Sequence, residues 1–222
     1  AKIKRIKFLG DKIYSDGTLR NIIISEEAKF WKFLTRNKYL DSNRIKIDRT
    51  KLEEFYKNRG FYGVKIKSTF AIINNENQFE LIFNINSGNK FYFDNIKIKE
   101  TNNIKIDNLE TFQKRFGNFV GEKYSKTKIV NLINDLNEFA LNNDFIFINA
   151  TFNEIVKDDN LIDIDINFED IKKTYIDRIN ILGNFITDEK VIRNMLIVDE
   201  GDPFNKILFE KSIQDIKSKN LF

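Results

Sequence analysis

Four aspartates that lie close together in the sequence could bind a metal ion. Asp158 and Asp159 precede Asp163 and Asp165, and closely spaced carboxylates can form a site for a hard cation such as Ca²⁺. The run contains no glycine for the sharp turn of a calcium-binding loop, and Asp163 and Asp165 alternate with isoleucines. We therefore expect a solvated strand face here and predict no metal site.

Residue types that carry out catalysis are scarce. The chain has no Cys and no His, which excludes thiol nucleophiles, disulfides, His general bases and most zinc sites. Ser125 and Lys128 have S-x-x-K spacing, but Ser125 is explained as the N-cap of a helix. Neither a Gly-rich phosphate loop nor a G-x-S-x-G elbow is present. We predict that the protein is not an enzyme, has no catalytic, metal-binding or cofactor-binding residues, and needs no cofactor.

Charge and hydropathy limit the classes of partner. The 222 residues include 37 basic and 33 acidic ones, for a net charge of +4. Because the two signs are mixed, screening leaves little long-range field, and we do not expect a nucleic-acid partner. A general polyanion binder is the alternative, and it predicts binding that weakens steeply with salt. No apolar run approaches the roughly 18 residues of a membrane helix. Since Ala1 leads directly into a strand, we expect a fragment of a longer protein.

The stretch 52–73 joins a helix to a strand. Leu52, Phe55 and Tyr56 have the spacing of one helical face. Gly60 then suits the left-handed conformation that follows many helices. From Val64 to Ile73 the period changes to two, which predicts a strand whose hydrophobic side faces a core.

This pattern recurs along the chain. Ile6, Ile96 and Ile179 lie in similar segments 90 and 83 residues apart. The spacing predicts three modules in an α+β fold: module one (1–89), module two (90–172) and module three (173–222). Each complete module has the order β-α-α-β-β, with two helices covering one face of a three-stranded mixed sheet. Module three lacks the last two strands and is expected to be truncated.

The elements expected within the modules are mostly short. Module one has a helix over 16–24, an aromatic-rich connection, a helix ending at Gly60, and strands over 64–73 and 79–85. Module two has a helix after Ser125, with strands over 146–156 and 162–168. Module three has a strand from Tyr175, a helix after Thr187, a turn at Gly201 and a second helix.

Several short segments resemble POTRA domains. They are the strand-glycine entries at 8–10 and 181–184, FYKNRGF at 55–61, the junction GNKFY at 88–92 and the turn GEKY at 121–124. Their order, with the aromatic segment at 30–31, is similar to the third, fourth and start of the fifth POTRA domains of the BamA family of outer-membrane β-barrel assembly factors. The resemblance covers essentially the whole chain.

The resemblance implies the periplasmic portion of an outer-membrane protein. The chain would be a binding or scaffold arm, with unfolded outer-membrane proteins and accessory lipoproteins of the assembly complex as partners. It would meet the membrane only through a C-terminal barrel that it lacks. A POTRA-type protein of a transport or two-partner secretion system, and a spacer arm without direct client binding, are the alternatives.

An edge strand is the main candidate for binding. If the first strand of a module pairs in parallel with the third, the second strand lies at the sheet edge and can accept another chain by β-augmentation. The outward Lys65 and Lys67 could instead protect this edge from pairing. The candidate residues in module one are Val64, Lys65, Ile66, Lys67, Ser68, Thr69, Phe70, Ala71 and Ile72, with 148–156 as their counterpart in module two.

Other candidate sites lie in loops. Trp31 and Tyr39 could form a docking surface, since Trp and Tyr are enriched at binding hot spots, or they could pack beneath their own loop. Gly88 and Asn89, and Lys172 and Lys173, are expected to form the joints between modules. Because these joints are short, we expect preferred orientations between modules with some hinge motion.

Overall fold

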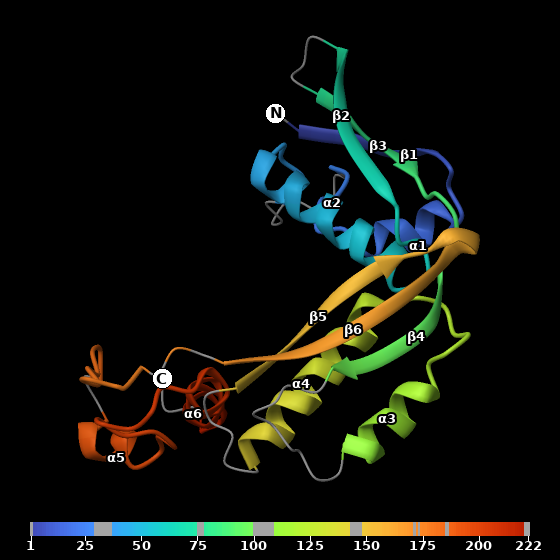
Figure 1. The fold of residues 1–222 in the computed structure, drawn as a ribbon. Helices are drawn as coiled ribbons and strands as arrows, with labels where there is room; N and C mark the ends of the chain where they lie inside the picture. The colour runs from blue at the N-terminus through green and yellow to red at the C-terminus, as the bar shows by residue number, and fades with distance from the viewer. Residues whose placement is uncertain are drawn as a thin grey trace. The chain divides into compact units, whose positions relative to one another are not determined.

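The computed structural model describes residues 2–28, 37–74, 78–99, 109–142, 148–170, 172, 174–184 and 187–219. Its elements have the mixed α+β character that the sequence predicts (Figure 1). They are β1 (Lys2–Gly10), α1 (Asp16–Arg20), α2 (Ser42–Lys57), β2 (Lys65–Asn74), β3 (Gln78–Asn86), β4 (Tyr92–Lys99), α3 (Leu109–Gly117), α4 (Lys126–Asn142), β5 (Ile148–Val156), the 3₁₀ turn η1 (Asp158–Asn160), β6 (Leu161–Asp170), α5 (Glu189–Arg193) and α6 (Lys206–Ser218).

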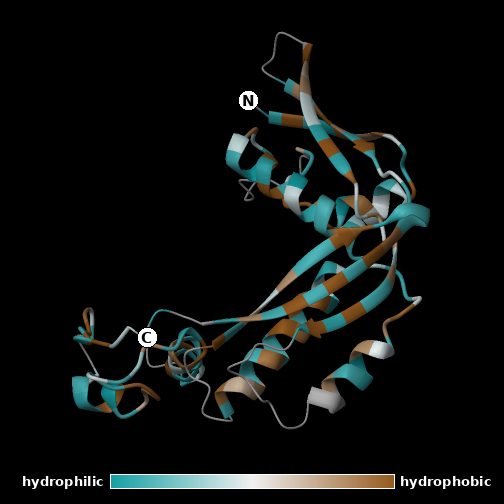
Figure 2. Cartoon of the chain, in the orientation of Figure 1, coloured by the Kyte–Doolittle hydropathy of each residue, from teal (hydrophilic) through white to brown (hydrophobic). Residues whose placement is uncertain are grey.

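The first sheet has the strand order β1-β3-β2. β1 pairs with β3 in parallel, and β2 pairs with β3 antiparallel. This confirms the mixed topology and leaves β2 at one end of the sheet. α2 lies across one face (Figure 1), where Leu52 and Tyr56 pack into a core with Ile6 and Phe83. Hydrophilic and hydrophobic residues alternate along the strands in Figure 2, as expected for a sheet covered on one face.

The first helix is shorter than predicted. The sequence predicts a helix over 16–24, but α1 ends at Arg20. The reason lies in α2, where the fully buried Asp48 accepts hydrogen bonds from the backbone N–H groups of Ile24 (2.5 Å) and Ser25 (3.1 Å). A buried carboxylate requires hydrogen-bond donors. Because the N–H groups of Ile24 and Ser25 donate to Asp48, they do not continue the helix.

The second sheet has the order β4-β6-β5. Its central strand β6 buries alternate residues: Ile162, Ile164, Ile166 and Phe168. α4 begins as predicted, since the Ser125 hydroxyl accepts a hydrogen bond from the Lys128 N–H (3.4 Å). α3 lies in a stretch for which the sequence analysis located no helix. Phe116, near its end, is fully buried.

The strand predicted from Tyr175 is absent from the described residues 174–184, where the chain forms one isolated bridge between Tyr175 and Pro203. That prediction is wrong for a physical reason. A strand needs a hydrogen-bonded neighbour, as β3 is for β1, and the described part of module three provides no such strand. α5 and α6 form where two helices are expected.

One backbone contact recurs at the predicted repeat spacing. A residue near the start of each module donates its N–H to a carbonyl before the second helix: Ile3 to Lys38 (2.8 Å), Phe93 to Glu122 (2.9 Å) and Ile176 to Asp202 (2.9 Å). These donors are 90 and 83 residues apart, like Ile6, Ile96 and Ile179. The backbone therefore repeats in the predicted register.

By internal contacts, the chain divides into two compact units. The first takes in 1–98, 108–131 and 153–165, and the second takes in 99–107, 132–152 and 166–222. The first sheet lies wholly in the first unit, and α5 and α6 lie in the second. This division follows contacts and not the repeat, so the module boundaries stay a prediction. None of the helices in the described ranges has both the length and the apolar character needed to span a bilayer.

Candidate protein-binding edge

β2 is the candidate edge strand of the first sheet. In the part of the chain that the structure describes, its one neighbour is β3, which it meets from Lys65–Asn86 to Asn74–Gln78. Its outer side therefore carries backbone donors and acceptors without a strand partner. The sequence places the start of the candidate strand at Val64, whereas β2 begins one residue later.

The second half of β2, which contains Phe70 and Ile72, is more exposed than predicted. Ile66 is 3 % exposed, but Phe70 and Ile72, which were expected to share its buried face, are 59 % and 71 % exposed. The expectation of a half-buried strand is wrong for this part. The pairing of Phe70 with Leu81 keeps Phe70 on the predicted face, but the alternation of buried and exposed residues ends here, since residues 69–73 are all exposed. Phe70 contacts Phe79 of β3 edge to face, with ring centroids 5.9 Å apart.

The other face of β2 is polar near its start. Lys65, Lys67 and Thr69 are exposed. Among the described residues, neither lysine has a carboxylate within ion-pair distance. Their charges are therefore free to discourage self-pairing of the edge or to interact with an acidic side chain of a visiting strand.

The opposite edge of the sheet, along β1, is occupied by the chain itself. The N–H of Ile3 donates to the Lys38 carbonyl (2.8 Å), and the Ile3 carbonyl accepts from the Ala28 N–H (2.7 Å). At Ile6, the N–H donates to the Glu27 carboxylate (3.0 Å) and the carbonyl accepts from the Arg20 guanidinium (2.9 Å). These contacts leave less room for a visiting strand on β1 than on β2.

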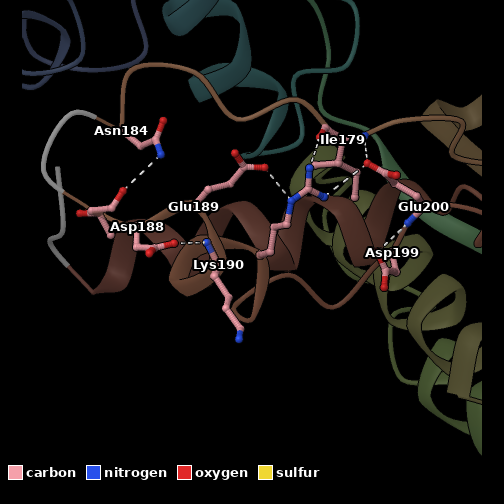
Figure 3. Close-up of polar contacts among 9 residues, drawn as sticks. Ile179, Asn184, Asp188, Glu189, Lys190, Asp199 and Glu200 are labelled. Carbon is pink, nitrogen blue, oxygen red and sulfur yellow. Dashed lines mark hydrogen bonds and ion pairs between the residues drawn. The ribbon is translucent and has the colours of Figure 1, made fainter.

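Arg20 and Glu27 form an ion pair of 3.0 Å, and we call this pair and its two bonds to Ile6 the edge clamp. The clamp recurs at Ile179 (Figure 3). Ile179 donates its N–H to Glu200 (2.9 Å) and accepts from Arg193 (2.8 Å). The sequence separations are identical in the two modules, 14 residues to the arginine and 21 to the glutamate.

The clamp has an electrostatic consequence in module three. The Ile179 N–H stabilises the Glu200 carboxylate and is the main cause that lowers its pKa. The Arg193 guanidinium lowers this pKa further. Arg193 also contacts Glu189 (2.8 Å), and this hydrogen bond raises the pKa of Arg193. Both groups are therefore charged in the neutral range.

β5, the counterpart of β2, lies at the end of the second sheet. Its last residues, Ile155 and Val156, are about half exposed. The clamp is not repeated here, because Glu110 and Gly117 stand 14 and 21 residues after Ile96. Module two thus offers an edge at β5. Its opposite edge, β4, is occupied at Phe93 by backbone hydrogen bonds with Glu122 and Gly121 but lacks the arginine and glutamate of the clamp.

The joint between the first and second sheets lies within the first compact unit. The Phe91 N–H donates to the Gly60 carbonyl (2.8 Å), and Tyr62 meets Tyr124 edge to face at 5.0 Å. The Tyr124 hydroxyl donates to Glu154 (2.7 Å). Burial is the main cause that raises the pKa of Tyr124 well above its ordinary value, and the Glu154 carboxylate raises it further. The hydroxyl therefore stays a donor.

Asn58 extends this joint to the N-terminus of α4. Its side-chain oxygen accepts hydrogen bonds from the Thr127 N–H (2.9 Å) and the Ser125 hydroxyl (3.3 Å). Sequence reasoning found Ser125 as the cap but missed Asn58, because Asn58 and Thr127 are 69 residues apart. Of the predicted joint residues, Gly88 has φ +63° and Asn89 is exposed. At the second predicted joint Lys172 is exposed, and Lys173 lies outside the described residues.

The remaining candidate residues divide into two groups. Trp31 lies outside the described residues, and Tyr39 forms a bridge with Lys2 while staying 43 % exposed. Among the aspartates, Asp163 contacts the Lys157 ammonium (2.6 Å). Burial acts to raise the pKa of Asp163, but hydrogen bonds from Lys157 and the Asn95 N–H outweigh it and lower that pKa. Within the described ranges, no acidic cluster has the makeup of a metal site.

The chain is similar in sequence to known proteins. The family model "POTRA: Surface antigen variable number repeat" matches residues 1–88 and 174–220. The chain is 23% identical over 225 residues to the outer membrane protein assembly factor BamA of Neisseria meningitidis, covering 100% of this chain and 28% of that protein. It is 25% identical over 202 residues to BamA of Neorickettsia risticii, covering 90% and 27%.

A solved structure shows the same fold. The crystal structure of Haemophilus influenzae BamA POTRA3-5 superimposes with a TM-score of 0.69 at 15% identity, covering 100% of this chain and 87% of that one. The chain spans little more than a quarter of the length of the two BamA relatives.

Proposed function

The chain belongs to the POTRA family, and from this we propose that it is a scaffold arm that takes up strands of other proteins at the edge of its first sheet. The observation that carries the proposal is the difference between the two edges of that sheet. β1 is closed by the edge clamp, whereas β2 is open and has exposed hydrophobic side chains.

The mechanism is addition of a strand through the main chain. An extended segment pairs with the outer backbone groups of β2, which are the same for any sequence, and this suits a protein with many clients. Phe70 and Ile72 then cover alternate hydrophobic side chains of the visitor, as neighbouring strands do within a sheet. Lys65 and Lys67 discourage permanent association of two open edges.

The setting of this function follows from the relatives. The arm is the periplasmic portion of an outer-membrane protein and takes part in outer-membrane protein assembly, the process named for both BamA relatives. Its partners are unfolded outer-membrane proteins and accessory lipoproteins of the assembly complex. Binding and scaffolding need no catalysis. Modules one (1–89), two (90–172) and three (173–222) are its proposed domains, supported by the recurring backbone contact.

The test is a titration of the isotopically labelled chain with an extended peptide from an outer-membrane barrel strand. We expect amide shifts concentrated on Lys65–Ile72. A peptide of the same composition, reordered but still alternating, should bind similarly because the recognition is made by the backbone. The same peptide with N-methyl groups on alternate amides, in the frame that faces β2, should lose binding. Shifts spread evenly over the surface would refute the proposal. So would unchanged binding of two N-methylated peptides, one methylated in the frame that faces β2 and the other in the alternate frame.

A spacer role is the second candidate, and the joint favours it. Asn58, Gly60 and Tyr62 contact the segment 91–127 through the backbone, a helix cap and an aromatic pair. A spacer depends on this joint and not on the edge. A proline substitution in β2 that keeps the fold would then leave assembly in cells unharmed, whereas loss of assembly favours the edge.

A further inference from the structure

A second surface, separate from β2, lies beside the joint in the first compact unit. Here a cleft of about 590 Å³ is lined by residues from the end of α2, the start of β4 and the loop before α4. This volume falls within the roughly 300–1,000 Å³ of typical ligand sites. The lining is rich in basic side chains, including Arg59, Lys90, Lys123 and Lys128.

Arg59 is positioned by neutral groups. Its guanidinium carbon lies 3.6 Å from the centroid of the Phe55 ring and 5.8 Å from that of Tyr14. One guanidinium nitrogen donates to the Phe55 carbonyl (3.1 Å). No carboxylate of the described residues lies within ion-pair distance of the Arg59 guanidinium. A guanidinium held in one orientation, with further N–H groups available, is preorganised for a carboxylate.

The other basic groups leave the cleft with an excess of positive charge. Lys90 lies over the ring of Phe61, 5.4 Å from its centroid, and Lys123 is exposed. Neither has a carboxylate within ion-pair distance in the described ranges. Glu122 is the single acid among the described lining residues, and it forms an ion pair with Lys128. Within the part of the chain that the structure describes, Arg59, Lys90 and Lys123 therefore lack a counter-charge.

Two of the N-terminal amides of α4 are already hydrogen-bonded. The Thr127 N–H donates to Asn58, and the Lys128 N–H donates to Ser125. These two amides are therefore not available to a ligand, whereas the basic side chains of the cleft are. Because three cations are spread over the wall, an occupant with several separate negative charges fits better than one with a single anionic centre.

We propose that this cleft binds an acidic peptide segment of a partner protein, whose carboxylates pair with Arg59, Lys90 and Lys123. A lipid headgroup phosphate or free phosphate offers one anionic centre and leaves the other cations unpaired. The inference goes beyond strand addition at β2. The cleft and β2 share no residue, so either can fail while the other holds.

The test measures binding of a fluorescent hexaglutamate peptide to the chain by anisotropy, with a hexaglutamine peptide as the neutral probe. The triple variant Arg59→Gln/Lys90→Gln/Lys123→Gln should bind hexaglutamate roughly tenfold more weakly, since partly exposed ion pairs are individually weak. The matched control Lys46→Gln/Lys51→Gln/Lys217→Gln removes the same charge at exposed positions elsewhere and should bind as the unmodified chain does. Added salt should weaken binding.

Three results would overturn the proposal. They are equal weakening in both triple variants, binding only to phosphatidylglycerol vesicles or to inorganic phosphate, and no hexaglutamate binding. If the cleft variant fails to fold, Lys123→Gln alone, at an exposed position, replaces it. In the unmodified chain, hexaglutamate should then shift the amide signals of Gly121 and Lys123, and absence of these shifts contradicts the proposal.

Discussion

At the residue scale, Gly10 fixes the way the chain leaves β1. Its φ is +86°, and a Cβ at this position would lie 2.2 Å from the Ile85 carbonyl oxygen. We expect Gly10→Ala to lower the free energy of unfolding by about 1–3 kcal/mol, through strain in a left-handed residue and this clash. Gly63→Ala is the control, because no atom lies within 4 Å of its Cβ. Urea unfolding measures both, and equal midpoints would contradict this reading.

Asn58 is predicted to stabilise α4 from outside that helix. The substitution Asn58→Ala removes the side-chain acceptor and leaves the exposed Thr127 N–H without this protein partner. We expect a loss of about 1 kcal/mol, as for other capping residues, together with faster hydrogen exchange at Thr127. Asn43→Ala, at an exposed position in α2, should change neither quantity. Unchanged exchange at Thr127 would show that Ser125 alone caps α4.

The edge clamp of module three should weaken at low pH, when Glu200 becomes protonated. Because the Ile179 N–H and Arg193 lower its pKa below the ordinary 4.5, the contribution of the carboxylate to stability is present above that pH. It is lost as the pH falls through the lower, folded-state pKa. A carbon-detected titration of Glu200 should give a midpoint below 4.5 that rises in Arg193→Gln. A midpoint unaffected by this substitution would mean that the ion pair does not form in solution.

At the scale of elements, the clamp should decide which edge of the first sheet is open. Glu27→Ala removes the acceptor of the Ile6 N–H. We expect a loss of about 1–3 kcal/mol for the unsatisfied amide, faster exchange at Ile6, and self-association at high concentration through the newly opened β1. Hydrogen exchange and sedimentation measure these effects. The matched control is Glu54→Ala at an exposed position of α2, and equal behaviour of the two variants would show that the clamp does not guard the edge.

The elements that sequence reasoning found are those set by local patterns. The period of two in 64–73 and 79–85, and the spacing of Leu52 and Tyr56, gave β2, β3 and α2 with small errors at their ends. α1 was predicted too long because its end depends on the buried Asp48, 23 residues or more away. Periodicity also assigned Phe70 to the correct face without showing that this face lacks cover.

The contacts that sequence reasoning missed join distant residues. Asn58 and Thr127 are paired only by the fold, and no local pattern reveals them. The clamp could have been found, since Arg20 and Glu27 follow Ile6 at the same separations at which Arg193 and Glu200 follow Ile179. Comparing the modules residue by residue would have shown this repeat.

At the scale of the molecule, we propose two separate surfaces for partners. On these proposals the open edge of β2 recognises the backbone of a partner, and the basic cleft recognises its charge. Backbone pairing should depend little on salt, whereas binding in the cleft should weaken as ionic strength rises. Titrating both peptides at low and high salt separates the two sites, and a common salt dependence would indicate one shared mode of binding.

The most direct measurement is an intermolecular NOE spectrum of the labelled chain bound to an unlabelled barrel-strand peptide. The account predicts an unbroken series of backbone contacts between the peptide and Lys65–Ile72, with none along β1. A peptide that lies along β1, or that contacts the chain only through side chains, would contradict it.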